Sequence, residues 1–237
     1  MSGPVSCTLA DGIATIALDD GKVNALSIAT LRALHEAFDE AEREQAVVVL
    51  TGREGYFSAG FDLRVFGEGI EPTIEMLRLG ATLTERMLLF PRPIVLASSG
   101  HAVAAGAFLL LAADVRIGVD GPFRVGLNEV EIGLTMPLFV IELARRRLHP
   151  ARLDEAILNA AIYEPRAAVE VGYLDRVVDA GQLLASARET AERLLALNSH
   201  AYTASKQRLR GAAAERVREA IETELTPDGL AAAAAPS

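Results

Sequence analysis

Cysteine and long apolar runs are scarce in this sequence, and each absence excludes a class of structure. Cys7 is the single cysteine among 237 residues, which excludes an internal disulfide and a cysteine-based metal site. No apolar run reaches the roughly 18 to 20 residues that a membrane-spanning helix needs. The first residues, MSGPVSCTLADG, have neither the basic start nor the apolar segment of a secretion signal. We therefore expect a cytoplasmic protein that does not bind membranes.

Positive charge is also in short supply. The chain has 32 acidic residues against 23 lysines and arginines, a net charge of −9. An acidic chain without a basic cluster is a poor nucleic-acid binder. An anionic ligand would have to be held by a local patch of backbone N–H groups and arginines. No metal-ligand spacing of His, Asp or Glu is present, so we expect neither a nucleic-acid partner nor a metal.

Short apolar runs predict a sheet core. Residues 5–9 and 13–17 alternate in polarity around Asp11-Gly12, which predicts a β-hairpin with a two-residue turn. Continuous apolar runs at 46–50 and 94–97 predict strands buried on both faces, and residues 114–119 are predicted to form another strand. Helical patterns lie between these runs, so the chain is predicted to form an α/β fold with a mainly parallel sheet.

Three helices are predicted in the first half of the chain. Ser27 is a candidate N-cap for a helix with Leu31, Leu34 and Phe38 on one face. A second helix is expected from about 73 to 90. Residues 100–113 are small and apolar all round, which predicts an internal helix.

The second half is predicted to be helical almost throughout from residue 138, with a break at 172–178. We divide the chain into a core of residues 1–190, a helical module of 191–230 and a disordered tail of 231–237. The tail ends in AAAAAPS, a low-complexity sequence.

Two glycine-rich junctions, 52–66 and 98–114, each follow a predicted strand and precede a helix. Gly and Ala let the backbone approach a ligand, and N–H groups at a helix N-terminus point at an anion or a carbonyl oxygen. If the two junctions face one cleft, each could supply one backbone N–H donor to an oxyanion hole. From the residues alone, close packing is the favoured interpretation of the second junction, whereas the first is less easily explained by packing. Neither matches a phosphate loop or a dinucleotide-binding fingerprint.

Six segments occur in order along residues 5–210: VNAL at 23–26, FSAGFDL at 57–63, PRPIVLASSGHAVAAG at 91–106, AADVRIG at 112–118, NEVEIGLTMP at 128–137 and AVEVGYLDRVV at 168–178. Together they resemble the crotonase (enoyl-CoA hydratase/isomerase) superfamily. The resemblance implies a ββα spiral core with a C-terminal helical module used in trimerisation, hence a homotrimer or homohexamer. It implies an acyl-CoA thioester ligand and no separate cofactor, because coenzyme A is part of the substrate.

The resemblance also places the binding residues. The two oxyanion donors fall on the backbone N–H groups of Phe61 and Ala105; the family usually has glycine at the second position, but alanine still donates its N–H. The substrate and coenzyme A track would be lined by Lys22, Val23, Ala25, Ala59, Gly60, Asp62, Leu63 and Phe108. Capping of the next helix is an alternative role for Asp62. Lys22, Arg53 and Arg64 are candidates for the phosphates, or for solvated surface positions.

Only one of the two family carboxylates is present. Hydratases of the superfamily carry two glutamates that hold and activate a water, and their positions fall here on Phe108 and Glu129. VGLNE at 125–129 is similar to IGLNE in Δ3,Δ2-enoyl-CoA isomerases, which also have an apolar residue at the first position. An apolar Phe108 beside Glu129 would raise the pKa of its carboxyl. We therefore predict a Δ3→Δ2 enoyl-CoA isomerase of β-oxidation with Glu129 as the single catalytic base.

Alternatives stay open. The protein could be an enoyl-CoA hydratase, a non-catalytic acyl-CoA binder, or an enzyme for another enolate reaction such as decarboxylation. In an extended segment Glu131 would share a face with Glu129 and supply the missing carboxylate; a turn, which we favour, would separate them. His101 is a weaker candidate for ligand contact, and Asp114 is predicted to be structural.

Overall fold

The computed structural model describes residues 3–234, with side chains described up to residue 230. A six-stranded sheet has the order β1-β2-β4-β7-β9-β12. Its strands are β1 (Val5–Ala10), β2 (Ile13–Leu18), β4 (Val47–Gly52), β7 (Ile94–Ser98), β9 (Val115–Val119) and β12 (Arg176–Val178). Within this sheet β1 and β2 pair antiparallel, and the other neighbouring strands pair in parallel. The predicted hairpin and the three further predicted strands are confirmed.

A second, four-stranded sheet carries the segments that follow the long strands. Its order is β11-β10-β8-β5, with β5 (Gly55–Ser58), β8 (Gly100–Val103), β10 (Val125–Gly126) and β11 (Ile162–Tyr163). Beside it, β3 (Ala25–Leu26) pairs in parallel with β6 (Gly60–Phe61). The chain passes repeatedly from a strand of the first sheet to a short strand of the second sheet and then into a helix. This order is the ββα repeat that the resemblance implies.

The helix predicted from residue 100 was wrong in its first turn. Residues Gly100–Val103 form β8, and α3 (Ala105–Ala112) begins only afterwards. A Cβ at Gly100 would lie 2.1 Å from the carbonyl carbon of Gly55, so this backbone is held against β5. Apolar periodicity cannot separate a short buried strand from a buried helix.

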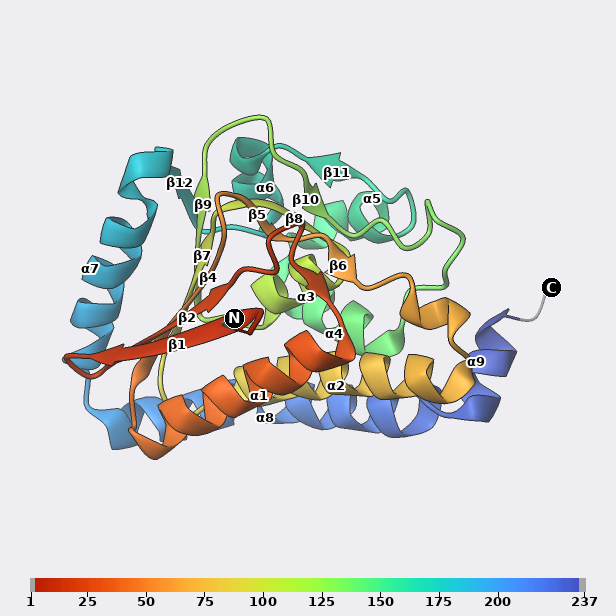
Figure 1. Ribbon diagram of the computed structural model, residues 1–237, viewed down its shortest axis with the longest axis horizontal. Coiled ribbons are helices and arrows are strands. Elements are labelled where there is room, and N and C mark those ends of the chain that lie inside the picture. Colours follow the sequence, from red (N-terminus) through yellow and green to blue (C-terminus); the bar gives the residue numbers. More distant parts are fainter. Residues whose placement is uncertain (1–2, 235–237) are drawn as a thin grey trace.

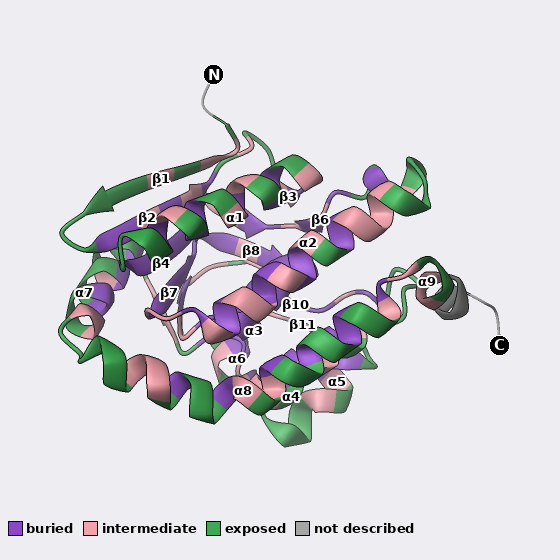
Figure 2. Cartoon of the chain, turned by 90° about the horizontal axis from the view of Figure 1, so that it is seen from below, coloured by how far each residue is buried: buried purple, intermediate pink, exposed green. Residues whose placement is uncertain are grey.

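Helices cover both faces of the large sheet. After η1 (Val65–Gly67), α2 (Ile70–Leu89) begins three residues earlier than predicted. Ser27 caps α1 (Ile28–Arg43), because its Oγ accepts a hydrogen bond from the Thr30 N–H at 3.1 Å. The predicted apolar face of α1 is buried, and α3 is buried along its whole length. Figure 2 shows β4 and β7 as buried strands enclosed by these helices.

The C-terminal part is helical, as predicted, apart from β11 and β12. It contains α4 (Leu138–Arg147), η2 (Pro150–Arg152), α5 (Leu153–Ile157), α6 (Pro165–Val171), η3 (Ala180–Gln182), α7 (Leu183–Leu195), α8 (Ser199–Glu224) and α9 (Pro227–Ala234). α7 packs against β4, β7 and β9, while α8 lies along α2 and α4 of the same chain (Figure 1).

The proposed division of the chain stays a prediction. The boundary at residue 190 falls inside α7, and α9 runs to Ala234, so it overlaps the predicted tail of 231–237. Residues 235–237 lie outside the described part.

Assembly into a trimer or hexamer also stays a prediction. Within residues 3–234, no helix combines the length and apolarity required to cross a membrane.

A buried ionic cluster joins α8 to the sheets. Asp114 Oδ2 lies 2.7 Å from Lys206 Nζ and also accepts the Ile94 N–H at 2.7 Å, while Asp114 Oδ1 lies 2.7 Å from Arg210 Nη1. All three charged side chains are less than a tenth exposed. Burial lowers the pKa of Lys206 to about 8, although Asp114 opposes the shift. The predicted structural role of Asp114 is therefore confirmed.

Candidate active site

The segments that carry the two predicted oxyanion donors lie against each other. A Cβ at Gly60 would be 3.3 Å from the Ala105 nitrogen and 2.8 Å from the Ala104 Cβ. Gly60 also has a φ of +97°, in the left-handed region that favours glycine. Phe61 is the residue after Gly60. The backbone that carries it therefore lies against the backbone at Ala105, which belongs to the other glycine-rich junction. A side chain at position 60 would collide with the start of α3.

The start of α3 is set by an unusual backbone conformation at Ala104. This residue has φ 49° and ψ −126°, a region that costs free energy for a residue with a Cβ. It turns the chain out of β8 so that the helix begins at Ala105. As the first helical residue, Ala105 has no preceding helical carbonyl for its N–H. That N–H is at the positive end of a buried helix, which suits a developing oxyanion.

Asn24 anchors the other side of the site, a role that the sequence analysis missed. Its side chain is 1% exposed and its Nδ2 donates to the carbonyls of Leu18, Tyr56 and Phe57 at 2.9, 3.0 and 3.1 Å. Asn24 therefore ties the VNAL segment to β5, immediately before Gly60. The only sequence signal was its place inside VNAL, because its three partners depend on the fold.

The predicted coenzyme A track is partly exposed and partly engaged in protein contacts. Lys22, Val23 and Leu63 are exposed, Ala25 and Ala59 are half-buried, and Gly60 is buried. Asp62 is buried, and its carboxylate binds the Arg64 guanidinium at 2.7 Å and the Arg64 N–H at 3.1 Å. Asp62 does not cap the next helix, because neither η1 nor α2 has a side-chain cap bond; its carboxylate is engaged by Arg64 instead.

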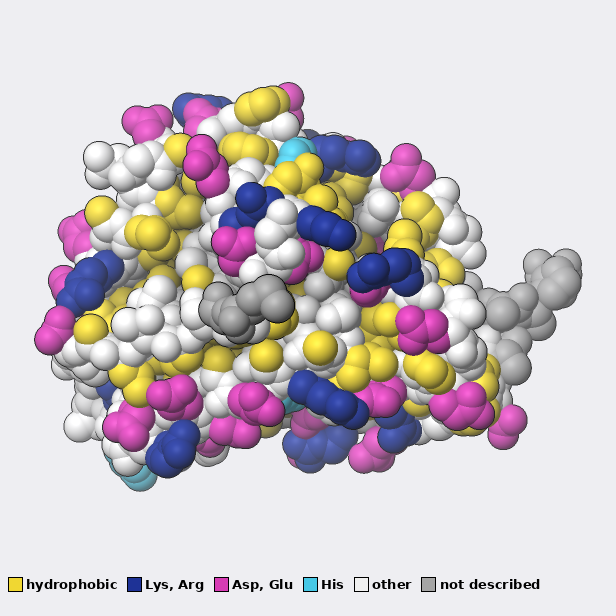
Figure 3. Space-filling model, in the orientation of Figure 1, with side chains coloured by type: hydrophobic (Ala, Val, Ile, Leu, Met, Phe, Trp, Pro, Cys, Tyr) yellow, Lys and Arg dark blue, Asp and Glu magenta, His cyan; other side chains and the backbone are white. Residues whose placement is uncertain are grey.

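No continuous basic surface accompanies these residues. Arg53 Nη1 donates to the Lys22 carbonyl at 2.6 Å, and its Nε lies 3.3 Å from Asp19. Figure 3 shows lysines and arginines mixed with acidic side chains across the face that it draws.

Glu129 is the buried carboxylate of the site. It lies just after β10 and is 5% exposed. Burial raises the pKa of Glu129 to about 7, although the backbone N–H groups of Glu129 and Asn128 stabilise the charged form. Its Oε2 has no hydrogen-bond partner among the described residues. A carboxyl that is half ionised near neutral pH, with one free oxygen, is suited to accept and return a proton.

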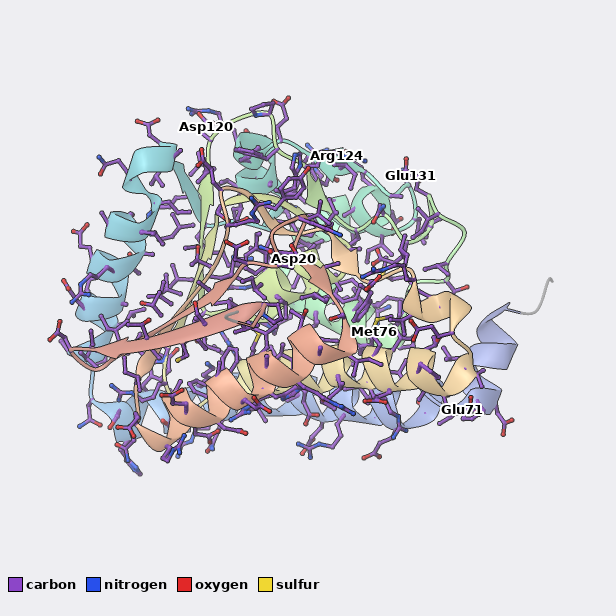
Figure 4. The ribbon with its side chains drawn as sticks, viewed as in Figure 1. Asp20, Glu71, Met76, Asp120, Arg124 and Glu131 are labelled. Atoms are coloured by element: carbon purple, nitrogen blue, oxygen red, sulfur yellow. The ribbon has the colours of Figure 1, made fainter. Side chains whose placement is uncertain are left out.

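Glu131 points away from Glu129, as we favoured. Between them the chain turns, since the Glu129 carbonyl accepts from the Ile132 and Leu134 N–H groups at 3.2 and 2.8 Å. The Glu131 side chain is 57% exposed and faces Arg124 at 4.0 Å, and Figure 4 shows it at the outer edge of the molecule. It does not supply a second carboxylate beside Glu129.

Phe108 is 2% exposed, and aromatic packing fills its surroundings. Its ring meets those of Phe61 and Phe139 edge to face, with centroids 6.0 and 5.7 Å away. Position 108, where the resemblance places the first carboxylate of hydratases, is therefore a buried aromatic side chain packed between two other rings. Across the part of the chain that the structure describes, no three His, Cys, Asp or Glu side chains gather as a metal site would require.

His101 is occupied at the edge of the second sheet. Its Nδ1 accepts the Arg124 N–H at 3.0 Å, and its ring contacts Tyr56 and Phe123. Burial, assisted by Arg124, lowers the pKa of His101, which favours the neutral ring. These contacts give His101 a packing role and no geometry toward Glu129.

Surface hollows do not locate this site. One hollow is lined by Val178, Gln182 and Glu189 among others, and another lies between the start of α2 and the end of α8. Neither includes Glu129 or Phe61. The buried Glu129 carboxyl and the backbone N–H groups of Phe61 and Ala105 are the better guide to the site, because they are the groups with the chemistry that the predicted reaction needs.

Comparisons with known proteins identify the family of this chain. The sequence profile of the enoyl-CoA hydratase/isomerase family matches residues 8–227. Mouse mitochondrial enoyl-CoA delta isomerase 1 is 27% identical over 90% of this chain and 76% of its own. Carnitinyl-CoA dehydratase of Salmonella heidelberg is 32% identical over 82% and 76%.

The fold is shared as well. The crystal structure of an enoyl-CoA hydratase/isomerase family protein from Pseudomonas syringae superposes with a TM-score of 0.92 at 44% identity, covering 94% of this chain and 96% of that one. The spiral core, the C-terminal helices and the ordered motifs thus have one explanation. The chain belongs to the enoyl-CoA hydratase/isomerase family, within the crotonase superfamily.

Proposed function

We propose that the protein is a Δ3→Δ2 enoyl-CoA isomerase acting in fatty-acid β-oxidation. The observation that carries the proposal is Glu129: a buried carboxyl with a pKa of about 7 and a free Oε2. Phe108 stands where a second carboxylate would be needed to hold a water. Moving a double bond needs one proton acceptor, whereas adding water needs a group that orients the water and a proton for the α carbon.

The proposed reaction uses Glu129 twice. Its ionised carboxylate removes a proton from C2 of a 3-enoyl thioester, and the electron pair moves onto the thioester oxygen to form a dienolate. The N–H groups of Phe61 and Ala105 donate hydrogen bonds to that oxygen. Protonated Glu129 then delivers its proton to C4, the electrons return to form the C2–C3 double bond, and the carboxylate is regenerated. We assign the coenzyme A portion to Lys22, Val23, Ala25, Ala59, Gly60 and Leu63.

Hydration of a 2-enoyl-CoA is the second candidate. A relative at 32% identity is named carnitinyl-CoA dehydratase, so hydration or dehydration chemistry lies within this level of similarity. The dry aromatic packing around Phe108 argues against efficient hydration, because it leaves Glu129 without a second acceptor to orient water. A non-catalytic acyl-CoA binder would have no need for a buried, unpartnered carboxylate, which costs stability.

The deciding experiment compares two substrates on the purified protein. Turnover of 3-hexenoyl-CoA is followed by coupling to a hydratase and a dehydrogenase, and hydration of crotonyl-CoA by loss of the enoyl thioester absorbance. We expect kcat/KM for isomerisation to exceed that for hydration at least roughly a hundredfold, which is about 2.7 kcal/mol of barrier. Hydration as fast as isomerisation would overturn the assignment, and binding of coenzyme A without either activity would favour the binding protein.

Gly106→Ala is expected to lower kcat at least about tenfold, since small displacements of positioned groups have effects of this size or larger. A Cβ at position 106 would lie 2.6 Å from the Ser58 carbonyl oxygen, which forces α3 away from β5. The shift moves the Ala105 N–H relative to Phe61. Steady-state kinetics on 3-hexenoyl-CoA measure the effect.

Gly211→Ala in α8 is the matched control, because a Cβ there meets nothing within 4 Å. It should leave kcat unchanged and stabilise the fold by about 0.5–1 kcal/mol, the usual gain of alanine over glycine in a helix. Wild-type kcat in Gly106→Ala would show that the position of α3 does not limit the reaction.

A further inference from the structure

Two arginines from the last turn of α4 hold the C-terminal end of α3. Helix α3 has no charged side chain of its own, and all eight of its residues are buried. Arg146 Nη2 donates to the Leu111 carbonyl at 2.7 Å. Arg147 Nη2 donates to the carbonyls of Ala113 and Asp114 at 3.0 and 2.7 Å. These bonds satisfy carbonyls at and just beyond the helix end, where intrahelical partners run out.

Hydrogen bonding alone does not explain why both donors are charged. Among the described residues, no acidic side chain forms an ion pair with either guanidinium, and the Nε of each is buried without a hydrogen-bond partner. Asp114 is already shared between Lys206 and Arg210, at 2.7 Å from each. Burial and neighbouring arginines lower the pKa of Arg146 to about 9, which leaves it charged at neutral pH. A neutral amide could cap the same carbonyls without the cost of an unpaired, partly buried charge.

The charge has a use at the other end of α3. The aligned peptide dipoles of a helix place partial positive charge at its N-terminus and partial negative charge at its C-terminus. Eight residues span only about 12 Å, so the negative end of this buried helix weakens the attraction that an oxyanion would feel at the Ala105 N–H. Two cations beside the negative end offset it. The positive potential that remains at Ala105 suits a thioester oxyanion.

Helix α4 also connects α3 to the segment that carries Glu129. It begins at Leu138, after the turn that follows Glu129, and packs beside α3 (Figure 1). Near its start, the Phe139 ring meets the Phe108 ring of α3 with centroids 5.7 Å apart. In its last turn, the two arginines meet the end of α3. Loss of an arginine would therefore loosen α3, and with it the Ala105 N–H, relative to the Glu129 segment.

We propose that Arg146 and Arg147 are positioning residues for the oxyanion hole. From the C-terminal end of α3 they fix the helix and supply the positive charge that strengthens the Ala105 N–H as a donor to the thioester oxygen. They act through α3 and not by contact with the substrate. The effect on turnover rests on the isomerase function proposed above, whereas the effect on a bound thioester rests only on the donor at Ala105.

The test is the carbonyl stretching frequency of bound hexanoyl-CoA labelled with ¹³C at C1, a saturated thioester that can be neither isomerised nor hydrated. Isotope-edited infrared difference spectra record it in wild type, Arg146→Gln and Arg146→Lys. Binding to wild type should lower the frequency, because the positive end of α3 polarises the carbonyl. The lowering should be smaller in Arg146→Gln and largely retained in Arg146→Lys, which keeps the charge. For 3-hexenoyl-CoA, kcat should fall about tenfold in Arg146→Gln, with KM within about twofold.

Arg145→Gln is the matched control. It makes the same change in the same turn of α4, on a side chain that is 64% exposed and pairs with Glu142 at 3.1 Å. The carbonyl frequency and kcat should stay at their wild-type values. If Arg146→Gln does not fold, Arg147→Gln removes the other cation from the same helix end and should reduce the lowering of the frequency in the same way.

A folded Arg146→Gln protein whose bound thioester keeps the wild-type frequency would overturn the proposal, because a purely structural cap changes only the free energy of unfolding. Equal losses in Arg146→Gln and Arg146→Lys would also overturn it, since the charge would not be the cause. An unshifted frequency in wild type would do the same. A wild type that polarises the carbonyl but does not isomerise 3-hexenoyl-CoA would refute the proposed function and leave this inference intact.

Discussion

Replacing Glu129 by glutamine is expected to reduce isomerisation of 3-hexenoyl-CoA by roughly 10²- to 10⁴-fold, the usual contribution of a positioned general base. Glutamine keeps the size of the side chain and can still accept the backbone N–H groups of residues 128 and 129. It cannot take up the proton from C2. The loss should appear in kcat, because the coenzyme A contacts are untouched, and is measured by steady-state kinetics.

Glu131→Gln is the matched control, since it makes the same chemical change two residues away on an exposed side chain. We expect kcat within about twofold of wild type, as for most surface substitutions. Equal losses in the two variants would mean that charge near the site matters more than a specific base.

The pH dependence should show the same group. Because Glu129 must be ionised to act and its pKa is about 7, kcat/KM should fall about tenfold per pH unit below neutrality and level off above it. A profile that stays flat down to pH 5 would contradict the raised pKa.

Glu129→Gln should also stabilise the fold at alkaline pH. The pKa of the carboxyl rises from 4.5 to about 7 on folding, so folding favours the protonated form. The resulting contribution to the free energy of unfolding of the wild type is fully present below pH 4.5 and is lost as pH rises through 7. Its size is roughly 3 kcal/mol. Glutamine stays neutral at every pH. Urea unfolding should therefore give the variant a larger free energy of unfolding than wild type at pH 8 and a similar one at pH 4.5. A constant difference between these pH values would contradict the linkage.

Asp114→Asn is expected to destabilise the protein by about 3–5 kcal/mol, the usual effect of breaking a buried ion pair from one side. Lys206 and Arg210 would remain buried without a counter-charge, and the Ile94 N–H would lose a charged acceptor. Because both cations belong to α8, that helix should separate first from α2 and α4. Urea unfolding gives the change in free energy, and amide hydrogen exchange in α8 gives its location.

Asp11→Asn provides the control, because Asp11 pairs with Arg188 on the surface. Asparagine also tolerates the φ of 53° at this turn position. The expected change is within about 1 kcal/mol, as for exposed pairs. Similar losses in both variants would argue against a special role of the buried cluster.

The loss in Asp114→Asn should shrink as pH rises. The pKa of Lys206 is already lowered to about 8 in the fold, and removal of Asp114 lowers it further. The folded state then binds fewer protons than the unfolded state, so stability increases with pH. The variant should be closer to wild type at pH 9 than at pH 7; a loss that grows with pH would show that the lysine charge is not the cause.

Local sequence chemistry predicted the elements well where a local rule sufficed. Asp11-Gly12 has left-handed φ at both residues, as a two-residue hairpin turn requires, and Ser27 forms the predicted cap. Local sequence chemistry failed at residues 100–103, where the backbone of Gly100 lies close to Gly55 and the segment forms a strand. No local pattern announces a contact with a residue 45 positions earlier.

The candidate site divides in the same way. Residue type at two positions, Glu129 and Phe108, was enough to predict a single base without a second carboxylate beside it. The turn after Glu129 decided that Glu131 faces solvent. Burial, which only the packed chain provides, raised the pKa of Glu129 to about 7.

The sequence by itself determined the family, the strand-helix alternation and the carboxylate that we propose as the catalytic base, because these depend on residue type and on short-range spacing. Tertiary structure alone decided that Gly60 meets the start of α3, that Asn24 joins VNAL to β5 and that Asp114 holds Lys206 from 92 residues away. Such contacts form between segments far apart in the chain, so their partners exist only once the sheets and helices have packed.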